Sequence, residues 1–560
     1  MGRLLSYFAF VVTISACADV TAPAARAMVD ARETRALSAT AGVTYFLNVS
    51  GNDANPGTSP ATAWRSVGAV NARSFNPGDR ILFRKGTIFP GALAFGPDDH
   101  GTAVSPIVIG THGVGRATID GGSGTAIRIY NTSGFEIRNI EVIGSGYATN
   151  TGSGIDIYSD LPGGVKLPYI VLDSVEASGF GQFGVVLGSW NGMTGFSDVR
   201  MTSSDAHGNG RGGFATYAEL PYTHRNVYLG HLDAHDNPGI AGLPGNSGSG
   251  IVLGGVSGGT IERSVAHDNG ALCDAAEGPV GIWTYDSEGV VIQYNESYAN
   301  RTNGPADGGG FDLDQNTRNS LLQYNYSHGN AGSGILLAHA PANANHADNT
   351  VRYNVSENDG RLNAAAGISV WGRIIRAEIY NNSVYVSPSA TGTPRAMIVH
   401  NASIPGQFAQ SVHVRNNIFY AAGGLPVLWV SSGQLTGAVD LRFQMNDYFA
   451  DAAPPVFAWG ATTYSGLASW RIGSGQEMLG TVKLGGQRDP EFLAPGGGGT
   501  IGNADLLHTL TAYQLESSSL LINRGLNLLA HFGISPGMHD FWGVSIAQGS
   551  GFDIGAHERQ

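Results

Sequence analysis

The sequence has little charge, few lysines and almost no cysteine. Only 13% of its residues are charged and the formal net charge is -13, where about 25% charged residues is usual. Its three lysines are Lys85, Lys166 and Lys483. An acidic, cation-poor chain disfavours nucleic acid as a partner, because phosphate binding needs a basic surface. Two cysteines, Cys17 and Cys273, do not suffice for a disulfide framework or a cysteine-based zinc site.

The first residues are typical of an export signal. Arg3 precedes an apolar run, residues 4–14, that is too short to span a bilayer. Ile14-Ser15-Ala16-Cys17 resembles a bacterial lipobox, in which Cys17 is lipidated and becomes the mature N-terminus. We therefore expect an exported lipoprotein at the outer membrane or cell surface, which meets the membrane only through this N-terminal lipid anchor. The alternative is cleavage after Ala25-Arg26-Ala27, which gives a secreted protein.

The residues that are abundant indicate a repetitive β structure. Glycine accounts for 82 of 560 residues, about twice its usual share, and glycine with asparagine suits short strands joined by tight turns. Asparagine recurs at gaps of 28 to 32 residues in a first series: Asn209, Asn237, Asn269, Asn300, Asn330 and Asn358. A second series comprises Asn295, Asn325, Asn354, Asn382 and Asn417. Short alternating strands begin at Gly250-Ile251, Gly281-Ile282, Gly310-Phe311, Gly334-Ile335 and Gly367-Ile368.

A repeat of this length predicts a solenoid. One coil of about 30 residues cannot bury its apolar side alone, so coils must stack. Stacking places equivalent strands in parallel sheets, about 4.8 Å apart. Asparagine at equivalent turns then forms amide ladders, in which each hydrogen bond contributes about 1 kcal/mol net. The prediction is an all-β chain that forms one parallel β-helix with an N-terminal cap and an irregular C-terminal segment.

The two ends of the repeat resemble a known group of proteins. The segments that carry the resemblance are residues 44–53, 55–60 with Trp64, 489–492 and 552–558. They are similar to the entry and closing segments of the bacterial pectate-lyase-like right-handed parallel β-helix superfamily. Its members include lyases, hydrolases and epimerases, so the resemblance implies a carbohydrate-active fold without fixing the reaction. We expect a signal peptide (1–17), a tether (18–42), a cap with the first strands (43–125), regular coils (126–430), and C-terminal coils with a closing segment packed on the helix (431–560).

Strand alternation groups candidate site residues on one outer surface. Asp312 and Asp314 alternate with the inward Phe311 and Leu313, so both carboxylates point outward. The predicted catalytic residues are Asp307, Asp312, Asp314 and His339, and the predicted substrate-binding residues are Trp283, Tyr285, Asp286 and Trp371. Aromatic faces beside carboxylates suit a sugar, whose C–H faces stack and whose hydroxyls need acceptors.

The aspartates support more than one interpretation. Residues two apart on a strand lie about 6.6 Å apart, so Asp312 and Asp314 could act as acid and base of an inverting hydrolase. Proximity would raise the pKa of one of them. Alternatively, Asp307, Asp312 and Asp314 bind calcium, although Gln323 stands where a calcium loop has glutamate. A third alternative is a set of solvated aspartates without a ligand, so no cofactor is required.

The sequence contains two further groups of polar residues, a histidine row and a second outward patch. A histidine row, His207, His235, His267 and His328, is interrupted at Tyr298. Because its members lie one coil apart, we interpret it as turn packing and hydrogen bonding rather than as a metal site. Asp156 and Tyr158, with Lys166 nearby in sequence, form a second and weaker outward patch.

We expect a monomer whose partner is a polysaccharide. Three functions are compatible with the sequence. The first is a glycoside hydrolase that uses the aspartate cluster. The second is a calcium-dependent lyase of uronate polymers, with Lys166, Arg211 or His339 as the base that removes the C5 proton. The third is a surface glycan-binding protein without catalysis.

Overall fold

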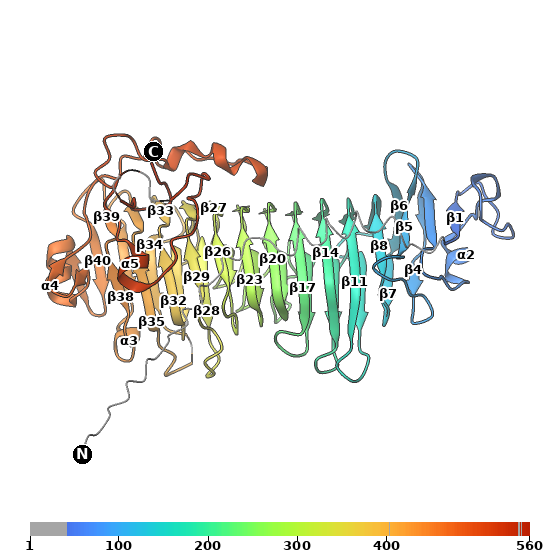
Figure 1. Ribbon diagram of the computed structural model, residues 1–560, viewed down its shortest axis with the longest axis horizontal. Helices are drawn as coiled ribbons and strands as arrows, with labels where there is room; N and C mark the ends of the chain where they lie inside the picture. Colours follow the sequence, from blue (N-terminus) through green and yellow to red (C-terminus); the bar gives the residue numbers. More distant parts are fainter. Residues whose placement is uncertain (1–41, 403, 547–548, 550, 560) are drawn as a thin grey trace, which may run out of the picture. The chain divides into compact units, whose positions relative to one another are not determined.

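The protein winds through three long parallel sheets, and each regular coil contributes one strand to each sheet (Figure 1). The structure is a computed structural model that describes residues 42–402, 404–546, 549 and 551–559. The predicted signal peptide, its Cys17 and almost all of the predicted tether lie outside the described residues.

Sheet A has 14 strands in the described residues. They are β1 (Thr44–Leu47), β2 (Arg80–Arg84), β5 (Ile107–His112), β8 (Phe135–Arg138), β11 (Lys166–Asp173), β14 (Gly195–Thr202), β17 (His224–Gly230), β20 (Val256–Glu262), β23 (Glu288–Gln293), β26 (Leu321–Gln323), β29 (Thr350–Arg352), β32 (Ile375–Tyr380), β35 (Gln410–Arg415) and β38 (Arg442–Gln444).

Sheet B has 13 strands in the same part of the chain. They are β3 (Ile88–Pro90), β6 (Ala117–Gly122), β9 (Ile140–Gly144), β12 (Glu176–Ser178), β15 (Asp205–His207), β18 (Asp233–His235), β21 (Val265–His267), β24 (Glu296–Tyr298), β27 (Tyr326–His328), β30 (Val355–Glu357), β33 (Ser383–Val386), β36 (Ile418–Ala421) and β39 (Asp447–Phe449).

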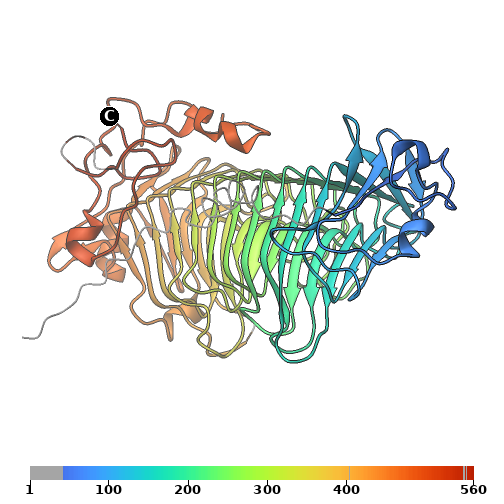
Figure 2. The same cartoon turned by 45° about the vertical axis from the view of Figure 1, so that its right-hand side comes forward.

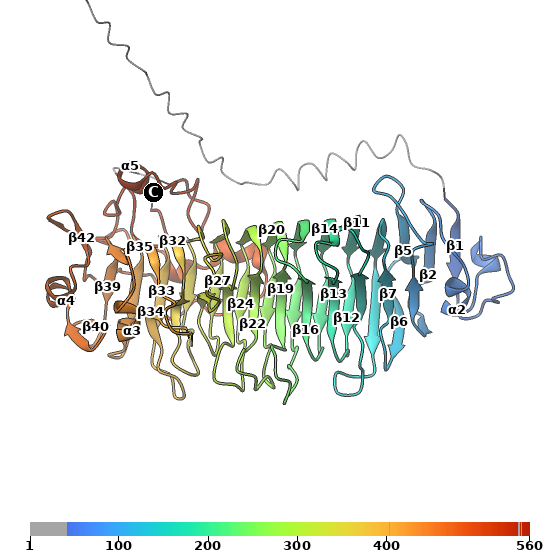
Figure 3. The ribbon, with the colours of Figure 1, turned by 90° about the horizontal axis from the view of Figure 1, so that it is seen from below.

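Sheet C has 14 described strands, and Figure 3 shows many of them side by side on one wall. They are β4 (Leu93–Phe95), β7 (Ile127–Tyr130), β10 (Ile155–Ser159), β13 (Phe183–Ser189), β16 (Gly212–Ala218), β19 (Ser249–Gly254), β22 (Val280–Tyr285), β25 (Gly309–Leu313), β28 (Ile335–His339), β31 (Ala366–Gly372), β34 (Arg395–His400), β37 (Pro426–Val430), β40 (Val456–Trp459) and the antiparallel β41 (Thr462–Ser465).

Helices are short and lie outside the regular coils. They are η2 (Pro60–Thr62), α2 (Val67–Asn71), α3 (Ser432–Leu435), α4 (Leu467–Ser474), η3 (Ala504–Thr509), η4 (Thr511–Tyr513) and α5 (Leu528–Phe532), and a small hairpin pairs β42 (Met478–Leu479) with β43 (Val482–Lys483). Within the described residues, none of these helices has the length and apolar character needed to cross a bilayer.

The core is a column of apolar side chains that the strands direct inward. Ile251, Ile282, Phe311, Ile335 and Ile368 pair in parallel register along sheet C. Each of them is at most 1% exposed. The glycine before each of these residues lies in its strand or directly before it. Alternation along the strand places every second side chain inside. The predicted all-β fold of stacked parallel coils is confirmed.

Two buried asparagine ladders run along the stack, and each ends on a carboxylate. In each ladder the side-chain amide of one residue donates to the side-chain oxygen of the next coil at 2.8 to 3.1 Å. The first ladder comprises Asn209, Asn237, Asn269, Asn300, Asn330 and Asp359. The second comprises Asn295, Asn325, Asn354, Asn382, Asn417, Asn446 and Glu477. A carboxylate only accepts hydrogen bonds, so it ends a ladder that runs in this direction.

One predicted ladder member is wrong. Asn358 stands outside the first ladder: it has a positive φ of 53°, and its side-chain oxygen accepts hydrogen bonds from Ser387. Asp359 takes the ladder position because the coil places that residue, one further along the chain, above Asn330. The prediction chose Asn358 because every earlier member of the series is an asparagine.

The C-terminal segment folds back against the strands of the solenoid (Figure 2). The Glu296 carboxylate of β24 accepts hydrogen bonds from the backbone N–H groups of Ile501 and Gly502 at 2.8 and 2.7 Å. The Tyr326 hydroxyl of β27 donates to the carbonyl oxygen of Gly499 at 3.0 Å. Because these partners belong to sheet B, this segment covers a different wall from sheet C.

Candidate functional site

Sheet C brings the predicted aspartates and aromatic residues onto one outer surface. Trp283 of β22 lies beside Asp312 of β25 in parallel register, and Asp312 lies beside Leu336 of β28. Leu336 in turn pairs with Ser369 of β31, two residues before Trp371. Because side chains on a strand alternate between its two faces, these residues all point away from the apolar column.

The strands and the loops that precede them enclose a cavity of about 560 Å³. Its walls include residues 276–278, 305–307, 332–333 and 363–365. The predicted site residues that line it are Trp283, Tyr285, Asp307, Asp312, Asp314 and Trp371. Three carboxylates therefore share one cavity with three aromatic rings.

Asp312 is the most enclosed of the three carboxylates, with 3% of its surface exposed. Its Oδ1 and the indole N–H of Trp283 are buried and have no hydrogen-bond partner among the described residues. Burial, with the charges of Asp314 and Asp307 adding to it, raises the pKa of Asp312 well above its usual value. This shift favours the protonated form of Asp312 over the ionised form. Unpartnered buried polar atoms in a cavity are groups that a bound polar ligand can satisfy.

Asp307 and Asp314 flank β25 and remain half-buried. The backbone N–H of Gly278 donates to Asp307 at 2.9 Å, and that of Gln315 donates to Asp314 at 2.7 Å. Burial, partly offset by these hydrogen bonds, raises the pKa of Asp307 to about 6 and that of Asp314 to about 7. Two carboxyl groups whose pKa values differ around neutrality suit a base and an acid.

A left-handed turn positions Asp307. Asp307 and Gly308 have φ values of 59° and 74°, a region that aspartate tolerates and glycine adopts freely. A Cβ on Gly308 would lie 2.9 Å from backbone atoms of Arg301 and Thr302. Only glycine fits there, so the turn before β25 is fixed by the Asp-Gly pair.

Comparisons with known proteins identify the fold. Residues 235–384 match the family model described as the right handed β-helix region. The chain contains a right-handed β-helix. The resemblance inferred from the two ends of the repeat is thereby confirmed, and the handedness agrees with the prediction.

The relatives of this β-helix include carbohydrate enzymes. The chain is 25% identical over 481 residues to lacto-N-biosidase of Bifidobacterium longum subsp. longum, a match that covers 65% of this chain and 28% of the relative. The chain thus spans little more than a quarter of that relative. Lacto-N-biosidase from Eubacterium ramulus superposes with a TM-score of 0.50 and 18% identity over 76% of this chain and 69% of that structure. A pectate lyase gives a TM-score of 0.39 and 19% identity over 94% and 98%.

Two predicted site residues do not line the cavity. His339 ends β28, and its Nδ1 accepts a hydrogen bond from the Asn316 N–H at 3.3 Å while Nε2 lies 3.3 Å from the carbonyl oxygen of Asn343. Asp286 accepts a hydrogen bond from the Asn316 side-chain amide at 2.6 Å. Both residues stabilise turns that follow sheet C strands, and the cavity lining drawn from the described residues includes neither.

Two ionisable residues that line the cavity, Glu277 and His400, were not among the predicted site residues. Glu277 lies in a loop, and its charge helps to raise the pKa values of Asp307 and Asp314. His400 lies beside Trp371 in register on β34, and burial lowers its pKa to about 4, so its ring is neutral at pH 7. Strand alternation would place His400 on the outer surface with Trp371. Its strand was not recognised because it begins with an arginine and lacks the Gly-Ile pair that marks the other strands. No comparable pattern marks Glu277.

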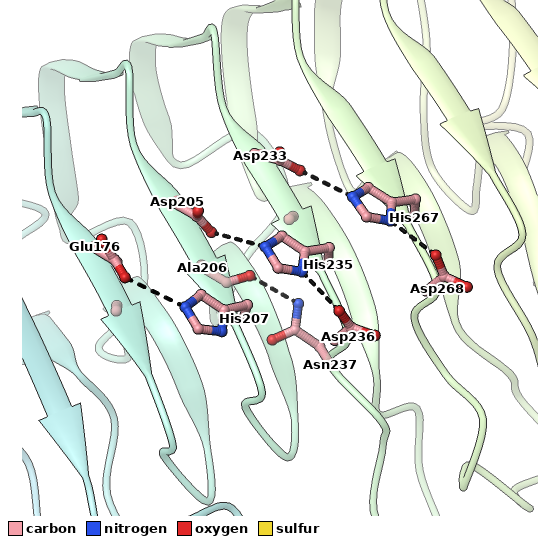
Figure 4. Close-up of polar contacts among 12 residues, drawn as sticks. Glu176, Asp205, Ala206, His207, Asp233, His235, Asp236, Asn237, His267 and Asp268 are labelled. Atoms are coloured by element: carbon pink, nitrogen blue, oxygen red, sulfur yellow. Dashed lines mark hydrogen bonds and ion pairs between the residues drawn. The ribbon is translucent and has the colours of Figure 1, made fainter. Parts of the chain in front are cut away.

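The histidine row lies on a different wall of the β-helix (Figure 4). Neighbouring rings stack in the order His207, His235, His267, Tyr298 and His328, with centroids 4.7 to 5.0 Å apart. The rings project from sheet B, and their nitrogens face carboxylates of neighbouring residues and coils. The row is thus a structural stack, and Tyr298 continues it.

The second predicted patch is divided between two sheets. Asp156 on sheet C lies 3.9 Å from the Arg128 guanidinium, and Tyr158 stacks with Tyr130 at 6.3 Å. Lys166 begins β11 of sheet A, where its ammonium group contacts the Met193 carbonyl oxygen.

The calcium alternative requires carboxylates that converge on one point. Within the described part of the chain, no group of three or more histidine, cysteine, aspartate or glutamate side chains is placed to hold a metal ion. Asp307, Asp312 and Asp314 share the cavity wall without such convergence.

Proposed function

We propose that this β-helix is a glycoside hydrolase whose reacting carboxyl groups are Asp307 and Asp314. The observation that carries the proposal is the cavity in which three carboxyl groups meet Trp283, Tyr285 and Trp371. Aromatic rings bind the apolar faces of sugars, and a pair of carboxyl groups with separated pKa values supplies the acid and the base that glycoside hydrolysis needs.

The proposed roles follow from exposure and pKa. Asp307, with the lower pKa of about 6, is the base or nucleophile, and Asp314, with a pKa of about 7, donates the proton to the departing oxygen. Asp312 was expected to pair with Asp314, but its near-complete burial favours a neutral, hydrogen-bonding role. When Asp312 is protonated, its carboxyl O–H can donate a hydrogen bond to a sugar hydroxyl and keep the proton.

The relatives support hydrolysis as the reaction class. The two lacto-N-biosidases are named for a glycosidase activity, and the cavity offers the carboxyl pair such an activity needs. The lyase alternative fits the cavity less well. A uronate substrate needs a cation beside its carboxylate, and the lining, as far as the described residues show, contains neither lysine nor arginine.

Export of the enzyme is part of the proposal. An apolar N-terminal run before Cys17 supports a lipid anchor at the outer membrane or cell surface, with secretion as the alternative. Labelling with a radioactive fatty acid tests it: a Cys17→Ala variant should lose the label that the wild-type chain acquires in a bacterial host.

The test of the reaction is a polysaccharide and oligosaccharide panel. Reducing ends and unsaturated products should be measured with and without a chelator. We expect reducing ends only, and Asp307→Asn and Asp314→Asn should each lower their release by about a hundredfold or more. Asp98→Asn, at an exposed loop aspartate, is the matched control and should keep wild-type rates.

The other functions give different outcomes in the same panel. Chelator-sensitive unsaturated products would establish the lyase instead. Retained binding with no product from any glycan would establish the non-catalytic binder. If Asp312→Asn abolishes turnover while Asp307→Asn does not, the assignment of the reacting pair is wrong.

A further inference from the structure

Aromatic side chains on the outer surface of sheet C extend well beyond the cavity. Tyr130 of β7, Tyr158 of β10, Tyr217 of β16 and Tyr285 of β22 occupy equivalent outward positions, and we call them the tyrosine row. All four are half-buried. Tyr130 and Tyr158 stack with an interplanar angle of 8°.

Glycine fills the two gaps in the row and lets the rings reach across them. Gly188 and Gly254 hold the outward positions of β13 and β19. A Cβ on Gly188 would lie 2.2 Å from Cζ of Tyr217, and one on Gly254 would lie 2.4 Å from Cε1 of Tyr285. Each ring therefore extends over the preceding coil. The row covers every coil from β7 to β22, a length of about 24 Å at the usual strand spacing.

The row is continuous with the candidate site. Val186, Ala215 and Val252, at the adjacent outward positions, form an apolar cluster against which Tyr217, Trp283 and Tyr285 pack. Trp283 and Tyr285 also line the cavity. A ligand held in the cavity can thus continue along the row without leaving the aromatic surface.

One exposed tryptophan follows a strand that contributes to the row. Trp190 follows β13 directly and is 56% exposed. A contiguous exposed apolar surface marks a binding site, whereas a single exposed residue does not by itself. In the chain, Trp190 lies two residues after Gly188, which holds the row position of β13.

The charge of the surface selects the kind of ligand. The outward positions of these six described strands carry one cation, Arg128, and one anion, Asp156, which lie 3.9 Å apart. They compensate each other, so the surface lacks the excess of cations that a uronate polymer needs. Tyrosine rings with hydroxyl groups suit an uncharged ligand with apolar faces and many hydroxyls.

We infer that the tyrosine row binds further sugar rings of a neutral polysaccharide or long oligosaccharide that runs along the β-helix axis. The inference rests on the proposed function, because it takes the cavity as the place where the reactive linkage sits. It makes the substrate an extended neutral glycan, held over several sugar rings on the N-terminal side of the aspartates.

Binding without turnover tests the row. The full chain carrying Asp314→Asn should be run in affinity gels that contain xylan, galactan, mannan or mixed-linkage β-glucan, with polygalacturonate as the charged comparison. We expect retardation by at least one neutral polymer and none by polygalacturonate. Tyr158→Ala and Tyr217→Ala should each raise the dissociation constant about threefold to tenfold, the loss of one aromatic contact.

Controls separate the row from folding and from catalysis. Tyr228→Ala, at a half-buried tyrosine of sheet A, should bind as the parent does. Tyr158→Ala removes a ring that lies outside the apolar core, so this variant should fold. It therefore tests the row even if Tyr217→Ala does not fold. The inference is overturned if no neutral polymer retards the protein, if only polygalacturonate does, or if both tyrosine variants bind normally. Loss of binding in these variants, with no reducing ends from any glycan, would retain the row and reject the hydrolase.

Discussion

Asn300 is the residue at which the first ladder meets the candidate site. Its side-chain amide nitrogen donates to the Ala266 carbonyl oxygen at 3.2 Å and to the Ser297 hydroxyl at 3.0 Å. The same nitrogen lies 3.0 Å from the Asn330 side-chain oxygen, so its two N–H groups are shared among three acceptors. The Asn300 side-chain oxygen accepts from Asn269 at 3.0 Å. All of these groups are buried. The turn that begins at Asn300 carries the chain to Asp307, so the ladder supports the loop that holds this carboxyl group.

Replacing Asn300 by alanine should lower both stability and activity. The two N–H donors, shared among three acceptors, lose their partners together with one accepted hydrogen bond. At about 1 kcal/mol for each of these three, the free energy of unfolding falls by about 3 kcal/mol. A chain of this length has an unfolding entropy of about 1.2 kcal/mol per kelvin, so Tm falls by about 2.5 °C. Neighbouring coils stabilise each other mainly through direct contacts, so the destabilisation should be concentrated in the coils next to Asn300. Local unfolding of these coils should therefore increase more than the Tm shift indicates.

Calorimetry and hydrogen exchange measure the two effects. Exchange should accelerate most in β24, β25 and β27, and kcat/KM should fall because Asp307 loses its fixed position. Asn303→Ala is the matched control, since Asn303 is exposed in the same loop. A Tm change below about 1 °C, or an equal change in the control, would show that the ladder contributes little and refute the reasoning.

Three further predictions concern charge and the glycine positions. The dependence of kcat/KM on pH should be bell-shaped with its maximum between about pH 6 and 7, because Asp307 must be ionised and Asp314 protonated; a profile flat from pH 5 to 9 would contradict these roles. A carboxylate of the preceding coil raises the pKa of His235 from 6.5 to about 9, so its contribution to stability is complete below pH 6.5 and is lost as pH rises through 9. His235→Gln should therefore reduce the decline in Tm over this range, as thermal melts at several pH values would measure. Gly254→Ala places a methyl group 2.4 Å from the Tyr285 ring and should weaken neutral-polymer binding at least threefold in affinity gels, whereas unchanged binding would argue against a role of this ring.

Much of the site could be predicted because strand alternation is a local rule. Once Phe311 was placed inside, Asp312 had to point outward, and the repeat then set Trp283 beside it. The loops obey no such rule. Glu277 reaches the cavity because residues 276–278 fold over it, and a loop's path depends on contacts with other coils. His339 lies outside the cavity lining for a similar reason. Both of its ring nitrogens contact a turn whose path depends on contacts between coils.

The sequence by itself determined the period, the strand faces and the buried columns of this protein, since all three follow from residue types at fixed spacing. Stacking in register decided the rest. It set Asp359 in place of Asn358 at the end of the first ladder, and it buried Asp312 while leaving Asp307 and Asp314 accessible to a ligand. Burial and the distance between charges arise only when separate coils meet, and these two quantities fix the pKa values on which the proposed chemistry depends.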